Sequence, residues 1–191
     1  MVEKTIVYFE KGGPENTYET LKLAKERADE LGIKDIVVAS SHGGTALKVA
    51  ELFDPKKINL VAVTICEGFR DRGWAMTMEE RERLHKMGIK TLTCIHALGD
   101  NAGSAFTEKH GGVTVEEVVR ETLYRLSQGM KVAVEIALMA ADAGLIPVDR
   151  EVIAIAGTGE GADTAIVLQP AYSRRFHELK IKEIIAKPRE P

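Results

Sequence analysis

The stretch from Asp35 to Ala46 reads Asp-Ile-Val-Val-Ala-Ser-Ser-His-Gly-Gly-Thr-Ala and decides the fold class of this chain. Residues 36–39 form a continuous apolar run, which is typical of a strand that is buried on both faces of a sheet. The glycine-containing turn leads directly into apolar residues at helical spacing, such as Ala46, Val49 and Phe53. A buried strand followed at once by a helix is the repeating unit of a parallel sheet covered by helices.

The same alternation of strand and helix continues along most of the chain. Strands are expected at residues 5–9, 35–39, 60–64, 91–95, 152–156, 165–168 and around 181–186. The segment 130–143 is apolar on nearly every side, so we expect it to form the most buried helix. The pattern predicts an α/β fold with a mostly parallel sheet and at least one antiparallel strand, which follows residues 157–164.

Two threonines mark further helix starts. Thr77 is followed three residues later by Glu80, and Thr114 is followed in the same way by Glu117. This spacing fits the capping box, in which a hydroxyl and a carboxyl group satisfy backbone amides of the first turn. We therefore expect helices to begin after Thr77 and after Thr114.

The composition limits the class of protein. The chain has 191 residues, 45% of them hydrophobic and 29% charged, and no repeat or linker-like tract divides it, so a single domain over residues 1–191 is expected. The formal net charge of −3 lacks the basic excess of a surface that binds nucleic acid or an anionic membrane, and neither partner is expected. No signal peptide or membrane span is recognisable, and the two cysteines fit a reducing compartment, so we expect a cytoplasmic protein. Few amide side chains among many charged ones favour a heat-adapted source.

The turn at residues 40–45 is the first candidate site. It consists of Ser40, Ser41, His42, Gly43, Gly44 and Thr45. Glycines let the backbone aim several N–H groups at one point, hydroxyls add donors, and the start of a helix adds partial positive charge. A phosphate group suits such a turn, although no lysine follows the second glycine as it would in a Walker sequence. The alternative is an ordinary connection in which Thr45 only caps the helix.

A second glycine-rich loop follows the apolar strand expected at 152–156. It consists of Gly157, Thr158, Gly159, Glu160, Gly161, Ala162 and Asp163. Glycines let backbone approach a ligand closely, whereas the alternative is a hairpin loop chosen for its flexibility. If the two preceding strands are neighbours, the two loops together predict a ligand that carries phosphate.

The residues around both loops resemble a known family. The succession of a helix, Ile-Val-Val-Ala-Ser, Ser-His-Gly-Gly-Thr-Ala, a second helix and Leu-Val-Ala-Val-Thr is similar to the carboxyl-terminal domain of pyruvate kinase. Ser40, Gly43, Gly44 and Thr45 match the family's phosphate-gripping turn, whereas His42 stands where the family has serine. The resemblance covers residues 17–168 and is strongest at the two loops. The whole chain also resembles small archaeal stand-alone proteins of this fold, in which bound flavin mononucleotide (FMN) is reported.

The resemblance implies a three-layer α/β/α sandwich in which the strands 35–39 and 152–156 lie side by side. Their loops then face each other at a topological switch point, where open α/β sheets bind ligands. In pyruvate kinase the first loop grips a phosphate of a sugar bisphosphate effector. Nothing in this chain resembles the catalytic barrel of that enzyme, so pyruvate kinase activity is not expected. The resemblance implies FMN as the cofactor and a possible homo-oligomer.

Further residues at the same edge complete the expected ligand site. Thr64 and Gly68 follow the strand 60–64, and Asn16 and Thr17 follow the first strand, where they donate to a ligand or cap the next helix. The loop 66–76 carries three apolar side chains that either cover an aromatic ring or pack onto the domain. These side chains are Phe69, Trp74 and Met76.

Four residues of types that bind metals lie in what reads as a long loop. They are His96, Asp100, Glu108 and His110, and their spacing matches no zinc motif, so no metal is expected. His96 is expected to line the pocket. Cys66 could be a nucleophile or a buried, inert thiol.

Three functions remain open on the sequence. The first is FMN binding, with the phosphate on residues 40–45. The second is a regulatory module that binds a sugar phosphate or another phosphorylated metabolite without catalysis. The third is a flavin-dependent oxidoreductase, in which the cofactor supplies the reactivity. No residue is assigned a catalytic role, because no carboxylate pair or triad spacing is present.

Overall fold

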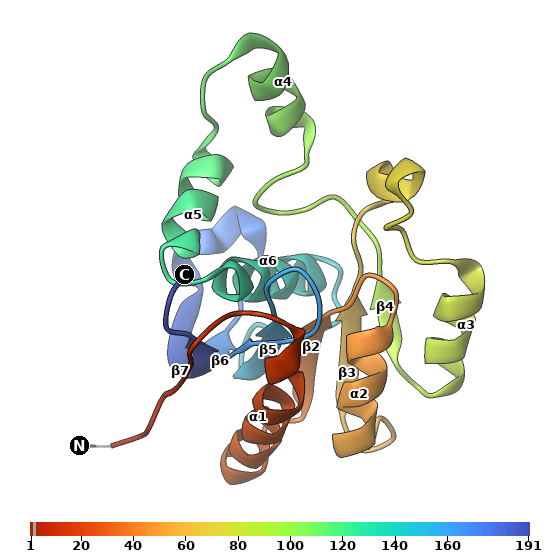
Figure 1. The fold of residues 1–191 in the computed structure, drawn as a ribbon, viewed down its shortest axis with the longest axis vertical. Helices are drawn as coiled ribbons and strands as arrows, with labels where there is room; N and C mark the ends of the chain where they lie inside the picture. The colour runs from red at the N-terminus through yellow and green to blue at the C-terminus, as the bar shows by residue number, and fades with distance from the viewer. Residues whose placement is uncertain (2) are drawn as a thin grey trace.

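Seven strands form one sheet in the computed structural model, which describes residue 1 and residues 3–191 (Figure 1). The strands are β1 (Val7–Phe9), β2 (Asp35–Ala39), β3 (Asn59–Val63), β4 (Lys90–Leu92), β5 (Val152–Ala156), β6 (Thr164–Gln169) and β7 (Lys180–Pro188). Their order across the sheet is β1-β7-β6-β5-β2-β3-β4. Strand β6 runs antiparallel to β5 and to β7, whereas the other pairs are parallel. The predicted α/β fold with an antiparallel return strand is confirmed.

Helices cover both faces of this sheet. The α-helices are α1 (Thr17–Leu31), α2 (Gly44–Leu52), α3 (Met78–Lys86), α4 (Ala102–His110), α5 (Val115–Tyr124) and α6 (Gln128–Asp142), and three short 3₁₀ helices are η1 (Pro14–Asn16), η2 (Glu67–Arg72) and η3 (Ser173–Glu178). One apolar cluster joins α1 and α2 to one face, and a second joins α6 to the other. The implied three-layer arrangement is therefore present. No helix within the described residues is long and apolar enough to cross a membrane.

Helix α6 is the most buried helix, as its composition predicts, and it nevertheless contains two buried charges. Lys131 and Glu135 form an ion pair one turn apart, and both side chains are almost fully buried. Glu135 also accepts a hydrogen bond of 2.9 Å from the backbone N–H of Leu98. This second bond ties the chain after β4 to α6, so the pair positions a loop as well as neutralising itself.

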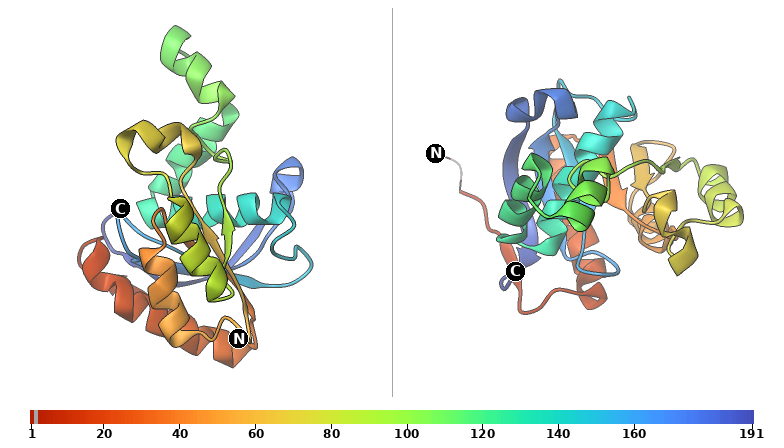
Figure 2. Two further views of the ribbon diagram at one scale, coloured as in Figure 1. Left: turned by 90° about the vertical axis from the view of Figure 1, so that its right-hand side faces the viewer. Right: turned by 90° about the horizontal axis from the view of Figure 1, so that it is seen from above.

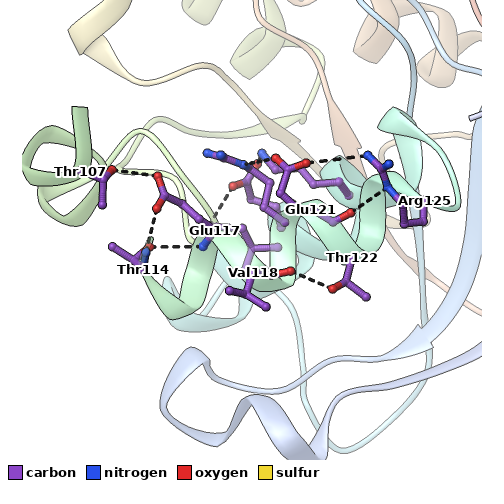
Figure 3. Close-up of polar contacts among 11 residues, drawn as sticks. Thr107, Thr114, Glu117, Val118, Glu121, Thr122 and Arg125 are labelled. Carbon is purple, nitrogen blue, oxygen red and sulfur yellow. Dashed lines mark hydrogen bonds and ion pairs between the residues drawn. The ribbon is translucent and has the colours of Figure 1, made fainter. Parts of the chain in front are cut away.

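Helices α4 and α5 project from the top of the molecule as an arm (Figures 1 and 2). The predicted capping box of Thr114 and Glu117 is present, and Glu117 also accepts a hydrogen bond of 3.0 Å from Thr107 of α4 (Figure 3). The capping box of Thr77 and Glu80 at the start of α3 is present too. Neither α4 nor α5 has a fully buried apolar residue, but Val119 and Leu123 of α5 are partly buried and pack against the apolar cluster of α6. The polar contact between Thr107 and Glu117 joins α4 to α5.

Three expectations about local structure were wrong. Strand β1 begins at Val7 instead of residue 5, and β4 ends at Leu92 instead of residue 95. Strand β4 is short because β3 offers it partners only from Val61 to Val63. The stretch expected to be one long loop contains α4, whose first turn is capped by the Asn101 side chain.

Gly129 in the first turn of α6 offers a test of how tightly the helix packs on the sheet. A Cβ atom at this position would lie 2.3 Å from Thr164 Oγ1 and 2.8 Å from Asp163 Oδ1. Because both neighbours are buried, the Gly129→Ala variant is expected to lose about 1–3 kcal/mol of unfolding free energy, measured by urea denaturation. Gly44→Ala is the matched control in the first turn of α2, where a Cβ meets nothing within 4 Å. Equal stability of the two variants would contradict the close packing.

Candidate functional site

The carboxyl ends of β1, β2, β3 and β5 meet at one edge of the sheet, which lies uppermost in Figure 1. Strands β2 and β5 are direct neighbours, and Val37 lies opposite Ala154. The chain leaves β2 toward β3 and β4 and later returns to β5 on the other side of β2. The edge between β2 and β5 is therefore a topological switch point, and the implied adjacency of the two strands that precede the glycine-rich loops is confirmed.

The first turn continues β2 and opens α2. Its buried Ser40 donates its backbone N–H to Val63 of β3 at 2.9 Å, and its hydroxyl oxygen accepts the N–H of Ala46 at 3.2 Å. Gly43 holds the cap position with φ of 83°, a left-handed conformation that favours glycine. Thr45 is buried and makes no capping bond, so the alternative that it merely caps the helix is wrong.

Gly44 is the residue of this turn that the fold itself does not require. Its side of the helix is exposed, and a Cβ there would meet nothing within 4 Å. Glycine in a helix costs stability relative to alanine, so an open glycine at the first turn calls for another reason. The N–H groups of Gly44 and Thr45 precede the intrahelical hydrogen bonds of α2 and carry the positive end of its dipole.

His42 joins this turn to the segment after β3. Its Nδ1 lies 3.2 Å from a carboxylate oxygen of Glu80, and its Nε2 lies 3.1 Å from the carbonyl oxygen of Gly73. Burial disfavours the charge on Glu80, but hydrogen bonds from Thr77 and His42 outweigh it and lower the pKa of the carboxyl group. Because Glu80 also caps α3, His42 fixes the first turn against the start of that helix.

The second loop is organised by the buried carboxylate of Asp163. One carboxylate oxygen accepts the backbone N–H groups of Gly13, at 3.0 Å, and of Thr158, at 2.9 Å. The other oxygen accepts the hydroxyl of Thr164 at 2.8 Å, and that hydroxyl lies 3.2 Å from the hydroxyl of Ser127 at the start of α6. Asp163 therefore points away from solvent and holds three segments of the chain together.

Two glycines of the second loop are needed for contacts inside the protein. A Cβ on Gly157 would lie 2.8 Å from the carbonyl oxygen of Gly161, and one on Gly161 would lie 2.3 Å from Thr17 Oγ1. Only Gly159, with φ of 73°, and Glu160 are exposed. The exposed tip of the second loop can face a ligand, whereas its base, including the buried Ala162, packs on the segment before α1.

The side chains of Asn16 and Thr17 do not cap α1, which was one of the two roles predicted for them. Asn16 makes no capping bond and donates to the carbonyl of Lys11 at 2.8 Å. Thr17 accepts the N–H of Ala162 at 3.0 Å and donates to Pro14 at 2.6 Å. Thr17 thus links the second glycine-rich loop to the segment before α1. Because its hydroxyl hydrogen is used in the bond to Pro14, Thr17 cannot donate it to a ligand.

The two sites expected after β3 differ in accessibility. Gly68 is exposed, whereas Thr64 is buried and its hydroxyl lies 2.5 Å from the hydroxyl of Thr93. Arg81 of α3 donates to that same Thr93 at 2.7 Å. Cys66 is half-buried, and burial raises the pKa of the Cys94 thiol, which makes Cys94 a poor nucleophile.

The three apolar side chains of the loop 66–76 do not share one environment, although the sequence suggested a common role for them. Met76 is buried in the core, whereas Phe69 and Trp74 stack on each other with centroids 5.5 Å apart. The His96 ring also stacks on Phe69, with centroids 6.3 Å apart, and its hydrogen bond to Asp100 lowers the pKa of that carboxyl group. Across the described part of the chain, no three metal-binding side chains gather, and neither Glu108 nor His110 joins His96.

Several residues that shape this edge escape sequence reasoning. Gly12 and Gly13 pack against the second loop, and the tract Gly-Gly-Pro was their only signal. Arg72 lies 5.4 Å from the ring centroids of both Phe69 and Trp74, and no sequence signal pointed to it.

Two surface hollows lie at the opposite edge of the sheet. They measure about 250 and 580 Å³, and both are bordered by Asp149 and Gln169. Asp35 borders the larger hollow, but its carboxylate already accepts from Arg150 at 3.0 Å and from Asn59 at 2.9 Å. We place the candidate site at the carboxyl edge, because the exposed first turn of α2 presents backbone amides there that precede its intrahelical hydrogen bonds.

Comparisons with known proteins found one matching family model and similar solved structures. Residues 19–168 match the model of the family described as "Pyruvate kinase, alpha/beta domain". Among solved structures, pyruvate kinase of Cryptosporidium parvum in complex with ADP is similar over 90% of this chain, with 16% sequence identity and a TM-score of 0.41. The match covers 24% of that enzyme, so this chain spans about a quarter of its length.

Asp163→Ala tests whether the buried carboxylate holds the second loop. The substitution leaves the N–H groups of Gly13 and Thr158 without their acceptor, so we expect a loss of about 1–3 kcal/mol in unfolding free energy. The matched control is Glu160→Ala on the exposed tip of the same loop, for which a change within about 0.5 kcal/mol is expected. If urea denaturation gives the two variants the same stability, the role of Asp163 is wrong.

Proposed function

The chain belongs to the family of the pyruvate kinase alpha/beta domain, and on this basis we propose that it binds a phosphorylated small molecule at the turn of residues 40–45. The observation that carries the proposal is Gly44. It exposes the first turn of α2 on a side where a Cβ would touch nothing, at a position where alanine would make a better helix. A ligand that contacts the backbone closely at this position explains why it is glycine and not alanine.

Phosphate is the group that suits this position best. The N–H groups at the start of α2 are donors with partial positive charge, and phosphate oxygens are strong acceptors with negative charge. The exposed hydroxyl of Ser41 lies in the same turn. Ser40 and Gly43 are buried and set the shape of the turn, so their contribution is geometric.

We propose FMN as the ligand, because the resemblance to small archaeal proteins of this fold implies it. Gly159 and Glu160, at the exposed tip of the second loop, lie at the same edge and extend the site beyond the phosphate. The other candidate is a sugar phosphate, which the match of Ser40, Gly43, Gly44 and Thr45 to the effector-gripping turn of pyruvate kinase supports.

The identity of the ligand is tested with the purified protein. After incubation with FMN and desalting, we expect the visible absorption of a bound flavin and a raised melting temperature. Ribose 5-phosphate is the comparison ligand, since it has the phosphate without the flavin ring. If the protein retains no flavin but is stabilised by ribose 5-phosphate, FMN is the wrong ligand and a sugar phosphate is the right one.

Gly44→Asp separates ligand binding from folding. A carboxylate at the first turn of a helix favours the folded protein by about 0.3–1 kcal/mol, yet it repels a phosphate at the same amides. We expect a melting temperature no lower than that of the original protein and an affinity for FMN at least about tenfold weaker, or about 1.4 kcal/mol. Gly44→Ala is the uncharged control. If Gly44→Asp binds FMN with unchanged affinity, the phosphate group does not bind at the first turn of α2.

A further inference from the structure

An array of aromatic rings lies next to the proposed phosphate turn. In this ring row, Phe69 stacks with both Trp74 and His96, and the planes of the two pairs differ by 22° and 18°. Trp74 comes from the loop after β3 and His96 from the segment after β4. Both segments leave the carboxyl edge of the sheet.

Trp74 ends this row and is the accessible member. Trp74 is 47% exposed, whereas the His96 side chain is 12% exposed. The next two residues, Ala75 and Met76, are buried and anchor the loop in the core. An exposed indole on an anchored loop keeps its orientation, so little conformational freedom is lost when another ring stacks on it.

Arg72 further fixes the indole. Its guanidinium carbon lies 5.4 Å from the ring centroid of Trp74 and 5.4 Å from that of Phe69, within the range of a cation–π interaction. The same guanidinium brings positive charge to the rim of the site. A ligand with both a planar ring and a phosphate group would gain from both features.

The ring row is physically linked to the phosphate turn through His42. The Nε2 atom of His42 contacts the carbonyl oxygen of Gly73, the residue directly before Trp74. On the other side, His42 is two residues from Gly44. The two features are therefore parts of one surface and not separate patches.

We propose that Trp74, held by Phe69 and Arg72, is the ring-binding part of the site and selects phosphorylated ligands that carry a planar heteroaromatic ring. This inference rests on the proposed phosphate site, and it names the ligand class as flavin or nucleoside monophosphates in place of sugar phosphates. Stacking on an aromatic side chain recognises the flat face of a ring and tolerates different heterocycles.

The test compares FMN, adenosine monophosphate and ribose 5-phosphate by calorimetry. The unaltered protein is expected to bind the two ring-bearing ligands at least about tenfold more tightly than ribose 5-phosphate. Trp74→Ala should remove this difference and leave the affinity for ribose 5-phosphate unchanged, whereas Trp74→Phe should restore most of it. Met78→Ala is the matched control, because Met78 is a nearby large side chain that is exposed and lies outside the row.

Trp74 is the only tryptophan of the chain, which gives a second readout. Its fluorescence should be quenched by adenosine monophosphate and stay unchanged with ribose 5-phosphate. Equal affinities of the unaltered protein for the ring-bearing ligands and ribose 5-phosphate, or unchanged FMN affinity in Trp74→Ala, would overturn the inference. If Gly44→Asp then still abolishes the binding of all three ligands, the proposal of a phosphate site holds and only the ring-binding role of Trp74 is wrong. If no ligand binds the unaltered protein, both proposals fail.

Discussion

The buried carboxylate of Asp163 is the interaction on which the carboxyl edge of the sheet depends. It accepts hydrogen bonds from the segment before α1, from the second glycine-rich loop and, through Thr164, reaches the start of α6. A buried carboxylate is costly unless several donors satisfy it, so these segments have to come together around it. The absence of a side chain at Gly12 and Gly129 provides the space for this junction, because a Cβ at either position would lie against Asp163.

The two glycine-rich loops therefore differ in purpose although their compositions are alike. In the second loop, Gly157 and Gly161 are required because protein atoms would collide with a Cβ. In the first, Gly43 is required by its positive φ, but Gly44 meets no such demand. The rigid second loop supports the edge, and the first presents open backbone. A ligand site needs both properties, since free amides bind well only when their positions are fixed.

Local patterns predicted the parts of the fold that local physics determines. Continuous apolar runs marked β2 and β5, and threonine–glutamate spacing marked the starts of α3 and α5. Helix α4 was missed because it buries only Ser104 and so has no apolar periodicity to detect. The adjacency of β2 and β5 came from family resemblance, because strand order is a non-local property that no single segment encodes.

The candidate site was predictable by segment but not by side-chain direction. An aspartate in a glycine-rich loop has the same local pattern whether it faces a ligand or backbone amides of its own protein. For Asp163 the choice is made by Gly13, which lies 150 residues earlier in the chain. Thr17 and Thr64 turn inward for the same reason, since buried partners satisfy their hydroxyls.

His42 shows how a departure from the family pattern can add to the site. Its two ring nitrogens face a carboxylate of Glu80 and the carbonyl of Gly73, and both partners are acceptors. A serine at this position would offer one hydroxyl to a phosphate. Histidine instead connects the turn of residues 40–45 to the loop that carries Trp74, through its contact with Gly73.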